Sequence, residues 1–228
     1  MEPVNRNNKR LPDTFKIFLS EWPLWLLIVA ALVLGAVVYP QLPERVASHW
    51  NYRGEVDGYS SRCWGAFGIP LLTAGIYLGM LLLPLIDPSR QNYEKFAGAY
   101  RVIKAVLVIF MTGLHLVVVL NALGFQAPVD RIVMTGVSLL LLVMGNYMGQ
   151  FRHNYFVGIR TPWTLANEVV WRKTHRLGGR LWVAAGILGL VGALMGGPAG
   201  GLALAVALAL AVIVPFVYSY LEFRRLSK

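Results

Sequence analysis

The sequence predicts an all-α integral membrane protein with about six transmembrane helices. Of its 228 residues, 57% are hydrophobic and only 14% are charged, whereas soluble domains carry roughly 25% charged residues. Apolar runs close to the ~20 residues needed to cross a bilayer recur along the chain. Lys and Arg are distributed unevenly between alternate loops, which sets the orientation. We expect both termini in the cytoplasm, a small hairpin loop outside and an amphipathic helix inside.

Six apolar segments are expected to span the membrane. They are Trp22–Tyr39, Ala66–Ile86, Val102–Leu123, Ile132–Gly149, Leu181–Gly196 and Gly200–Tyr220. A short connection rich in Gly and Pro separates the last two segments. We expect the helix to be interrupted there, because these residues break helices. The first span is long enough to cross the bilayer and no cleavage pattern follows it, so we expect no cleavable signal peptide. The lone Cys63 permits no internal disulfide.

Positive charge is concentrated on the side of the membrane where the predicted bundle has its N-terminus. Of the 21 Lys and Arg residues, 17 fall on that side, Lys104 at the start of the third span among them. The outer set is Arg45, Arg53, Arg62 and Arg131. Cytoplasmic loops are enriched in Lys and Arg, so loop 41–65 is placed outside and loop 150–180 inside. The net charge of +10 thus follows topology and indicates no nucleic-acid partner.

The outer loop is rich in turn-forming residues. The Asn51-to-Gly54 stretch and the Asp57-Gly58 pair both suit tight turns, which predicts a small hairpin standing on the membrane. Across such a hairpin, His49, Glu55 and Asp57 are candidate ligands for a zinc-like metal. The alternative is that the histidine and the aspartate only cap turns through hydrogen bonds.

The cytoplasmic loop contains a predicted helix from Pro162 to Leu177. Thr161 is suited to the N-cap, Pro162 to the first helical position and Gly178 to the stop. An apolar stripe bordered by cations predicts that this helix lies on the inner leaflet. Arg160 precedes the helix start, where an anion is favoured, so a phosphate or carboxylate site is one hypothesis. The other is that Arg160 caps a neighbouring helix or pairs with Glu168.

Two segments resemble known families. The stretch Asn154-Tyr-Phe-Val-Gly-Ile-Arg-Thr-Pro-Trp-Thr-Leu and the helix after it are similar to the signature of SdpI-type membrane proteins. The outer segment from Leu42 to Tyr59 resembles the DUF1648 module that precedes this signature in many members. The cytoplasmic motif residues are Asn154, Gly158, Ile159, Arg160, Thr161, Pro162, Trp163, Thr164, Trp171, Thr174 and His175. The outer motif residues are His49, Trp50, Asn51, Gly54, Asp57, Gly58 and Tyr59.

The resemblance implies an immunity protein that confers resistance to a secreted peptide toxin. In the founding member of the family, a transcriptional repressor is also captured at the membrane, so a repressor is an implied partner on the inner side. The resemblance further implies a division into a cytoplasmic segment, residues 1–21, a DUF1648-like module, 22–101, and an SdpI-like module, 102–228. No cofactor is expected, and the oligomeric state is left open.

Polar groups inside the spans suggest a different function. His115 lies near the middle of the third span and Asn146 near the inner end of the fourth; an ionisable residue at such depth indicates a functional site or an internal hydrogen bond. A small transporter with His115 lining its path is therefore an alternative. Three Gly-x-x-x-Gly motifs, Gly75–Gly79, Gly145–Gly149 and Gly192–Gly196, predict close helix crossings inside the bundle.

A membrane-embedded enzyme acting on lipid-linked substrates is the third hypothesis. It would use His175 or His49 as the base and Arg160 to bind phosphate. No nucleophile and base occur in a recognised constellation, so we predict a non-enzymatic protein in the cell membrane.

Overall fold

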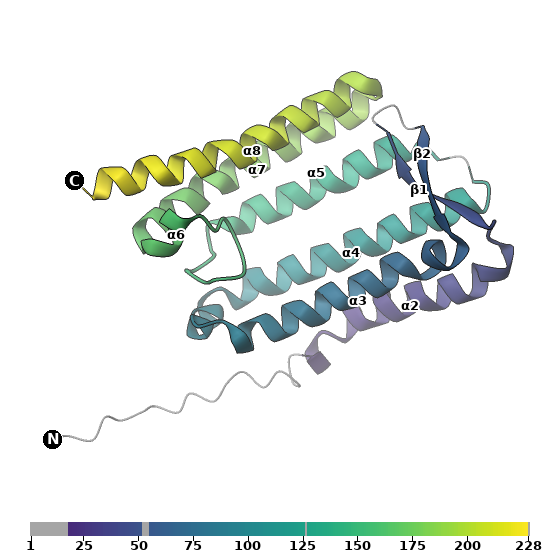
Figure 1. The fold of residues 1–228 in the computed structure, drawn as a ribbon, viewed down its shortest axis with the longest axis horizontal. Coiled ribbons are helices and arrows are strands. Elements are labelled where there is room, and N and C mark those ends of the chain that lie inside the picture. The colour runs from purple at the N-terminus through teal and green to yellow at the C-terminus, as the bar shows by residue number, and fades with distance from the viewer. Residues whose placement is uncertain (1–17, 52–54, 126, 228) are drawn as a thin grey trace.

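The computed structural model describes residues 18–51, 55–125 and 127–227, which form a bundle of long helices with a small sheet at one end (Figure 1). Within the described residues, six helices are long and apolar enough to cross a membrane. They are α2 Trp22–Val38, α3 Arg62–Ile86, α4 Ala97–Ala122, α5 Val129–Met148, α7 Glu168–Met195 and α8 Gly197–Leu226. The predicted class, an all-α multi-pass membrane protein, is confirmed.

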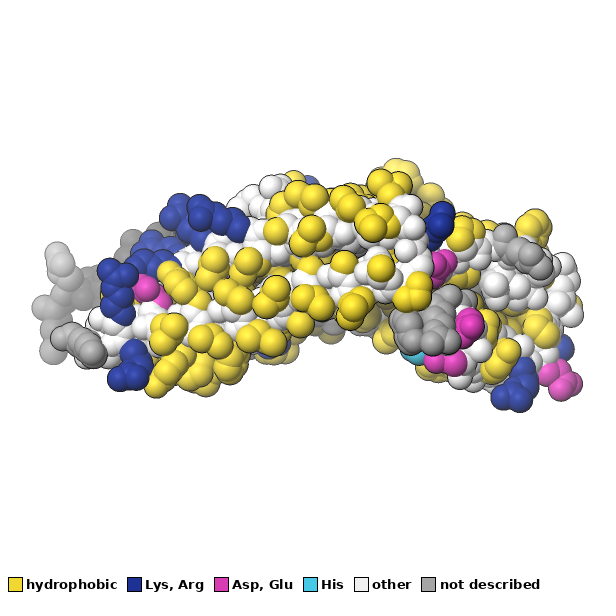
Figure 2. Space-filling model, turned by 90° about the horizontal axis from the view of Figure 1, so that it is seen from above, with side chains coloured by type: hydrophobic (Ala, Val, Ile, Leu, Met, Phe, Trp, Pro, Cys, Tyr) yellow, Lys and Arg dark blue, Asp and Glu magenta, His cyan; other side chains and the backbone are white. Residues whose placement is uncertain are grey.

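The surface of the bundle is apolar between its two ends. Large side chains such as Leu26, Val33, Leu82 and Ile213 are more than half exposed, as lipid-facing positions require. Figure 2 shows hydrophobic side chains along the middle of one face, with Lys and Arg gathered at the end where α8 finishes. Following the predicted orientation, we call this end the inner end and the opposite end, with the hairpin, the outer end.

The helices form two groups of three. In the first group α2, α3 and α4 pack against one another, and in the second α7 packs along both α5 and α8. The pairing of α4 with α5 joins the groups. Helix α4, which the predicted division assigns to the SdpI-like module, therefore packs mainly with the helices of the other module.

Glycines bring the helices of the second group into close contact. A Cβ atom added at Gly145 would lie 2.7 Å from the carbonyl oxygen of Gly179, and one at Gly200 would lie 2.3 Å from that of Gly192. Two of the three Gly-x-x-x-Gly motifs thus contribute a glycine to a tight crossing. The third does not, because added Cβ atoms at Gly75 and Gly79 would meet nothing within 4 Å.

The predicted outer hairpin is present. Strands β1 Arg45–Trp50 and β2 Val56–Ser61 pair antiparallel, after the short 3₁₀ helix η1 Tyr39–Gln41. Val46 is buried against Gly65 at the start of α3, which fixes the hairpin to the helix ends. The predicted turn residue Gly54 lies outside the described residues.

The predicted surface helix from Pro162 to Leu177 is wrong. A short helix α6, Pro162–Ala166, ends at Asn167, whose backbone is extended and whose side chain caps the next helix. Helix α7 then runs unbroken from Glu168 through Gly178 into the fifth span. Gly178 does not end this helix. Its lack of a side chain instead lets Ile159 and Met148 pack closely against the helix.

Candidate functional sites at the two ends of the bundle

The inner loop between α5 and α6 is organised around Asn154, which is fully buried. Its side-chain oxygen accepts hydrogen bonds from the backbone amides of Phe156 and Val157, and its amide nitrogen donates to the carbonyls of Arg152 and Val157. One side chain thus satisfies four backbone groups that a loop would otherwise leave unpaired. Its position in the motif has a structural explanation.

His175 and Trp171 on α7 form the floor of this loop. Both are 0% exposed, and their rings stack with centroids 4.1 Å apart. His175 Nε2 accepts a hydrogen bond from the amide of Ile159, Nδ1 pairs with the carbonyl of Trp171, and Trp171 Nε1 donates to the carbonyl of Phe151. Both ring nitrogens of His175 are occupied, so neither is available to a substrate.

Gly158 is required where the loop passes over His175. Its φ of +113° lies in the region that favours glycine. An added Cβ atom would lie 2.3 Å from His175 Nε2. The backbone therefore approaches the histidine ring more closely than any other residue would permit.

The start of α6 is tied to α8. Thr161 and Thr164 form a reciprocal capping box, and Thr161 Oγ1 also lies 3.0 Å from Ser219 Oγ. Trp163 packs against the rings of Phe216 and Tyr220. The buried Thr174 sits on the same inner side, and its hydroxyl makes no hydrogen bond within the described part of the chain.

Arg160 is one of the exposed residues of the motif. One guanidinium nitrogen donates to the carbonyl of Tyr155 at 3.1 Å. The predicted partner Glu168 forms no ion pair with it among the described residues. The predicted anion site at the following helix also lacks support, since α6 has only five residues and the capping box already engages the amides of Thr161 and Thr164.

Asp87, which the sequence analysis did not single out, joins the two helix groups at the inner end. Its carboxylate accepts hydrogen bonds from Ser89, the Tyr93 hydroxyl and the amide of Tyr155. A second link follows in η2, the 3₁₀ segment Arg90–Phe96, where Asn92 donates to the carbonyl of His153. The signature loop is thus anchored to both halves of the protein.

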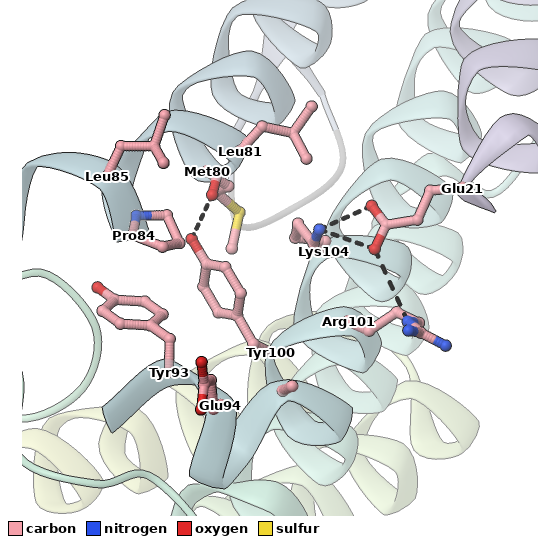
Figure 3. A pocket seen from close by; sticks show the side chains of 11 residues that line it. Glu21, Met80, Leu81, Pro84, Leu85, Tyr93, Glu94, Tyr100, Arg101 and Lys104 are labelled. Atoms are coloured by element: carbon pink, nitrogen blue, oxygen red, sulfur yellow. Dashed lines mark hydrogen bonds and ion pairs between the residues drawn. The ribbon is translucent and has the colours of Figure 1, made fainter. Parts of the chain in front are cut away.

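A buried ion pair lies at the inner end of the first helix group (Figure 3). Lys104 Nζ is 2.8 and 2.7 Å from the two carboxylate oxygens of Glu21, and the Tyr77 hydroxyl donates to the same carboxylate at 2.6 Å. Lys104 is 3% and Glu21 is 5% exposed. The sequence analysis counted Lys104 only among the cations of the inner side and overlooked Glu21. The sequence did contain a signal for this pair, because the charge of Lys104 inside an apolar run requires a partner.

A cavity of about 120 Å³ opens beside this pair. Its walls are mostly apolar, from Met80, Leu81, Pro84 and Tyr100, and Arg101 and Glu94 also line it (Figure 3). Arg101 reaches Glu21 only at 3.8 Å and is largely exposed.

The outer motif contrasts with the inner one, because its polar side chains are exposed. The His49 and Asp57 side chains are 71% and 44% exposed and contact each other, Nδ1 to Oδ1, at 2.5 Å. Asn51 bonds Glu55 across the turn, so the three predicted metal ligands do not converge. Within the described residues no group of three His, Cys, Asp or Glu side chains is placed to hold a metal.

The remaining outer motif residues complete a small surface. Trp50 is half-buried and Tyr59 is 54% exposed, under the guanidinium of Arg45. Gly58 lies close to His49 on the paired strand, since an added Cβ atom would lie 2.9 Å from that of His49.

The intramembrane polar residues are not brought together. His115 is 1% exposed, and neither ring nitrogen makes a hydrogen bond of standard geometry in the described part of the chain. The backbone of Ala31 on α2 is its polar neighbour. Asn146 is exposed at the inner end of α5.

Fold and sites together define a multi-pass membrane protein with a hydrogen-bonded loop at one end and a polar hairpin at the other. Residues 150–219 match the SdpI/YfhL protein family and residues 26–74 match a domain of unknown function, DUF1648. The chain therefore carries a segment that matches the SdpI/YfhL family, and a DUF1648 segment lies ahead of it.

Similarity to a curated relative extends over most of the chain. The chain is 25% identical over 202 residues to the immunity protein SdpI of Bacillus subtilis (strain 168). The matched region covers 89% of this chain and 95% of the relative. No solved structure matches.

Proposed function

We propose that this protein is a non-enzymatic immunity protein of the cell membrane that confers resistance to a secreted peptide toxin. The observation that carries the proposal is the similarity to immunity protein SdpI, which extends over 89% of the chain and includes both motifs. The inner motif adds support, because its residues form a packed structural core in place of a catalytic constellation.

The outer hairpin is the surface that we assign to the toxin. It is secured by the buried Val46 and presents His49, Asp57 and Tyr59 to the surroundings. A toxin that reaches the bilayer from outside would meet these side chains before the helices. The exposed rings and charges of such a surface suit binding of a peptide.

Capture of a repressor at the inner end is the second part of the proposal. The exposed members of the inner loop, Tyr155 and Arg160, are the residues we assign to that contact. The buried members hold the loop in shape, so a partner would bind a rigid surface.

The enzyme and transporter hypotheses receive less support. His175 has no free ring nitrogen, so it cannot act as a base without opening of the loop. His115 is enclosed, so a transport path along it would require α2 and α4 to separate.

The test is survival of a toxin-sensitive strain that expresses this chain. The strain is exposed to purified toxin from a related strain, and an unrelated six-span protein expressed at the same membrane level is the control. Protection by this chain alone supports the proposal. Equal killing of both cultures by every membrane-active peptide tried would reject it.

A further inference from the structure

A polar hollow lies at the inner end, where the motif residue Trp171 forms part of its wall. It has a volume of about 230 Å³ and lies between η2, the loop after α5 and the start of α7. The side chains around it that matter here are Asn92, Lys95, Arg152, His153, Glu168 and Arg172. Nothing in the proposed immunity function uses this hollow.

The walls of the hollow are held in place before any ligand arrives. Asn92 donates to the carbonyl of His153 and accepts from Lys95 Nζ at 2.8 Å. His153 Nε2 pairs with the carbonyl of Leu165 at 2.9 Å, and its ring lies against Trp171, 5.2 Å between centroids. A preorganised wall lowers the entropy cost of binding.

The charge of the hollow is positive. Lys95, Arg152 and Arg172 contribute three cations, whereas Glu168 contributes one carboxylate. Both arginines are exposed and, among the described residues, neither guanidinium is engaged in an ion pair or a hydrogen bond. Two free guanidinium groups beside a lysine match the geometry and the charge of a phosphate group.

We propose that this hollow binds a phosphate group, carried either by the headgroup of an anionic lipid or by a soluble phosphate ester. Its place at the inner end gives access to both sources, since the cytoplasmic leaflet is anionic. Arg160, where the sequence alone had suggested an anion, is not among the residues that line this hollow.

The experiment uses the purified full chain in a non-ionic detergent. In the lipid arm, native mass spectrometry measures retention of dioleoylphosphatidylglycerol against dioleoylglycerol, which lacks the phosphate. In the soluble arm, the melting temperature is measured with inorganic phosphate and with chloride at equal ionic strength. The double variant R152Q/R172Q and each single variant are compared with R180Q/R224Q, which loses the same charge at inner-end positions away from the hollow.

The proposal is supported by binding in either arm that meets two conditions. Binding should weaken roughly tenfold or more in R152Q/R172Q, because charge-assisted hydrogen bonds are lost. It should stay within about twofold of the wild type in R180Q/R224Q. Retention of the lipid identifies the headgroup as the source, and stabilisation by inorganic phosphate identifies a soluble ester. The proposal is overturned by binding in neither arm or by equal weakening in both double variants. It is also overturned if a polyglutamate peptide binds the hollow and phosphate does not. The single variants, with smaller losses, keep the test valid if the double variant does not fold.

Discussion

The inner and outer motifs of this chain use polar residues in opposite ways. At the inner end Asn154 and His175 are fully buried, and their side chains form hydrogen bonds with the backbone of the loop. At the outer end His49 and Asp57 are exposed and contact mainly each other. The difference teaches that a motif residue can be needed for structure at one face and be available for recognition at the other. Substitutions should separate these roles.

The largest effect is expected from Lys104→Met at the inner end. It removes the cation from Glu21 and leaves a buried carboxylate unpaired, which costs about 3–5 kcal/mol of unfolding free energy. Denaturant unfolding of the purified protein in detergent measures this loss. In the double variant Glu21→Gln/Lys104→Met most of the loss should disappear, because no buried charge remains. Wild-type stability of Lys104→Met would show that the pair does not hold α2 against α4.

Gly158→Ala should destabilise the inner loop by about 1–3 kcal/mol, through backbone strain and displacement of His175. Gly75→Ala is the matched control, because its added Cβ atom meets open space and alanine favours a helix by up to about 1 kcal/mol. Thermal unfolding of both variants under the same conditions makes the comparison. If both melt at the wild-type temperature, Gly158 is not held against the histidine as described.

Part of this contrast was predictable from sequence. Apolar run length predicted the six spans, and turn-forming residues around Asn51 and Asp57 predicted the hairpin. The break at Asn167 was missed, because Thr161, Pro162 and Gly178 fit the ends of a single helix and burial of Trp171 depends on packing that no local pattern encodes. Glu21 was missed for a similar reason: its partner Lys104 is 83 residues away along the chain.

The smallest effect on stability is expected at the outer end. His49→Ala removes one exposed contact with Asp57 and should change the unfolding free energy by no more than about 1 kcal/mol. Its far-UV circular dichroism and membrane level should match those of the wild type. A loss comparable to that of Gly158→Ala would mean that the outer motif is structural as well.

The most direct measurement is toxin survival combined with quantification of each variant in the membrane. The account predicts that His49→Ala and Tyr59→Ala abolish protection at wild-type membrane levels. Gly158→Ala should reduce protection only in proportion to its lower level. Full protection by both outer variants, or lost protection by Gly158→Ala at an unchanged level, would contradict the assignment of recognition to the outer end and structure to the inner end.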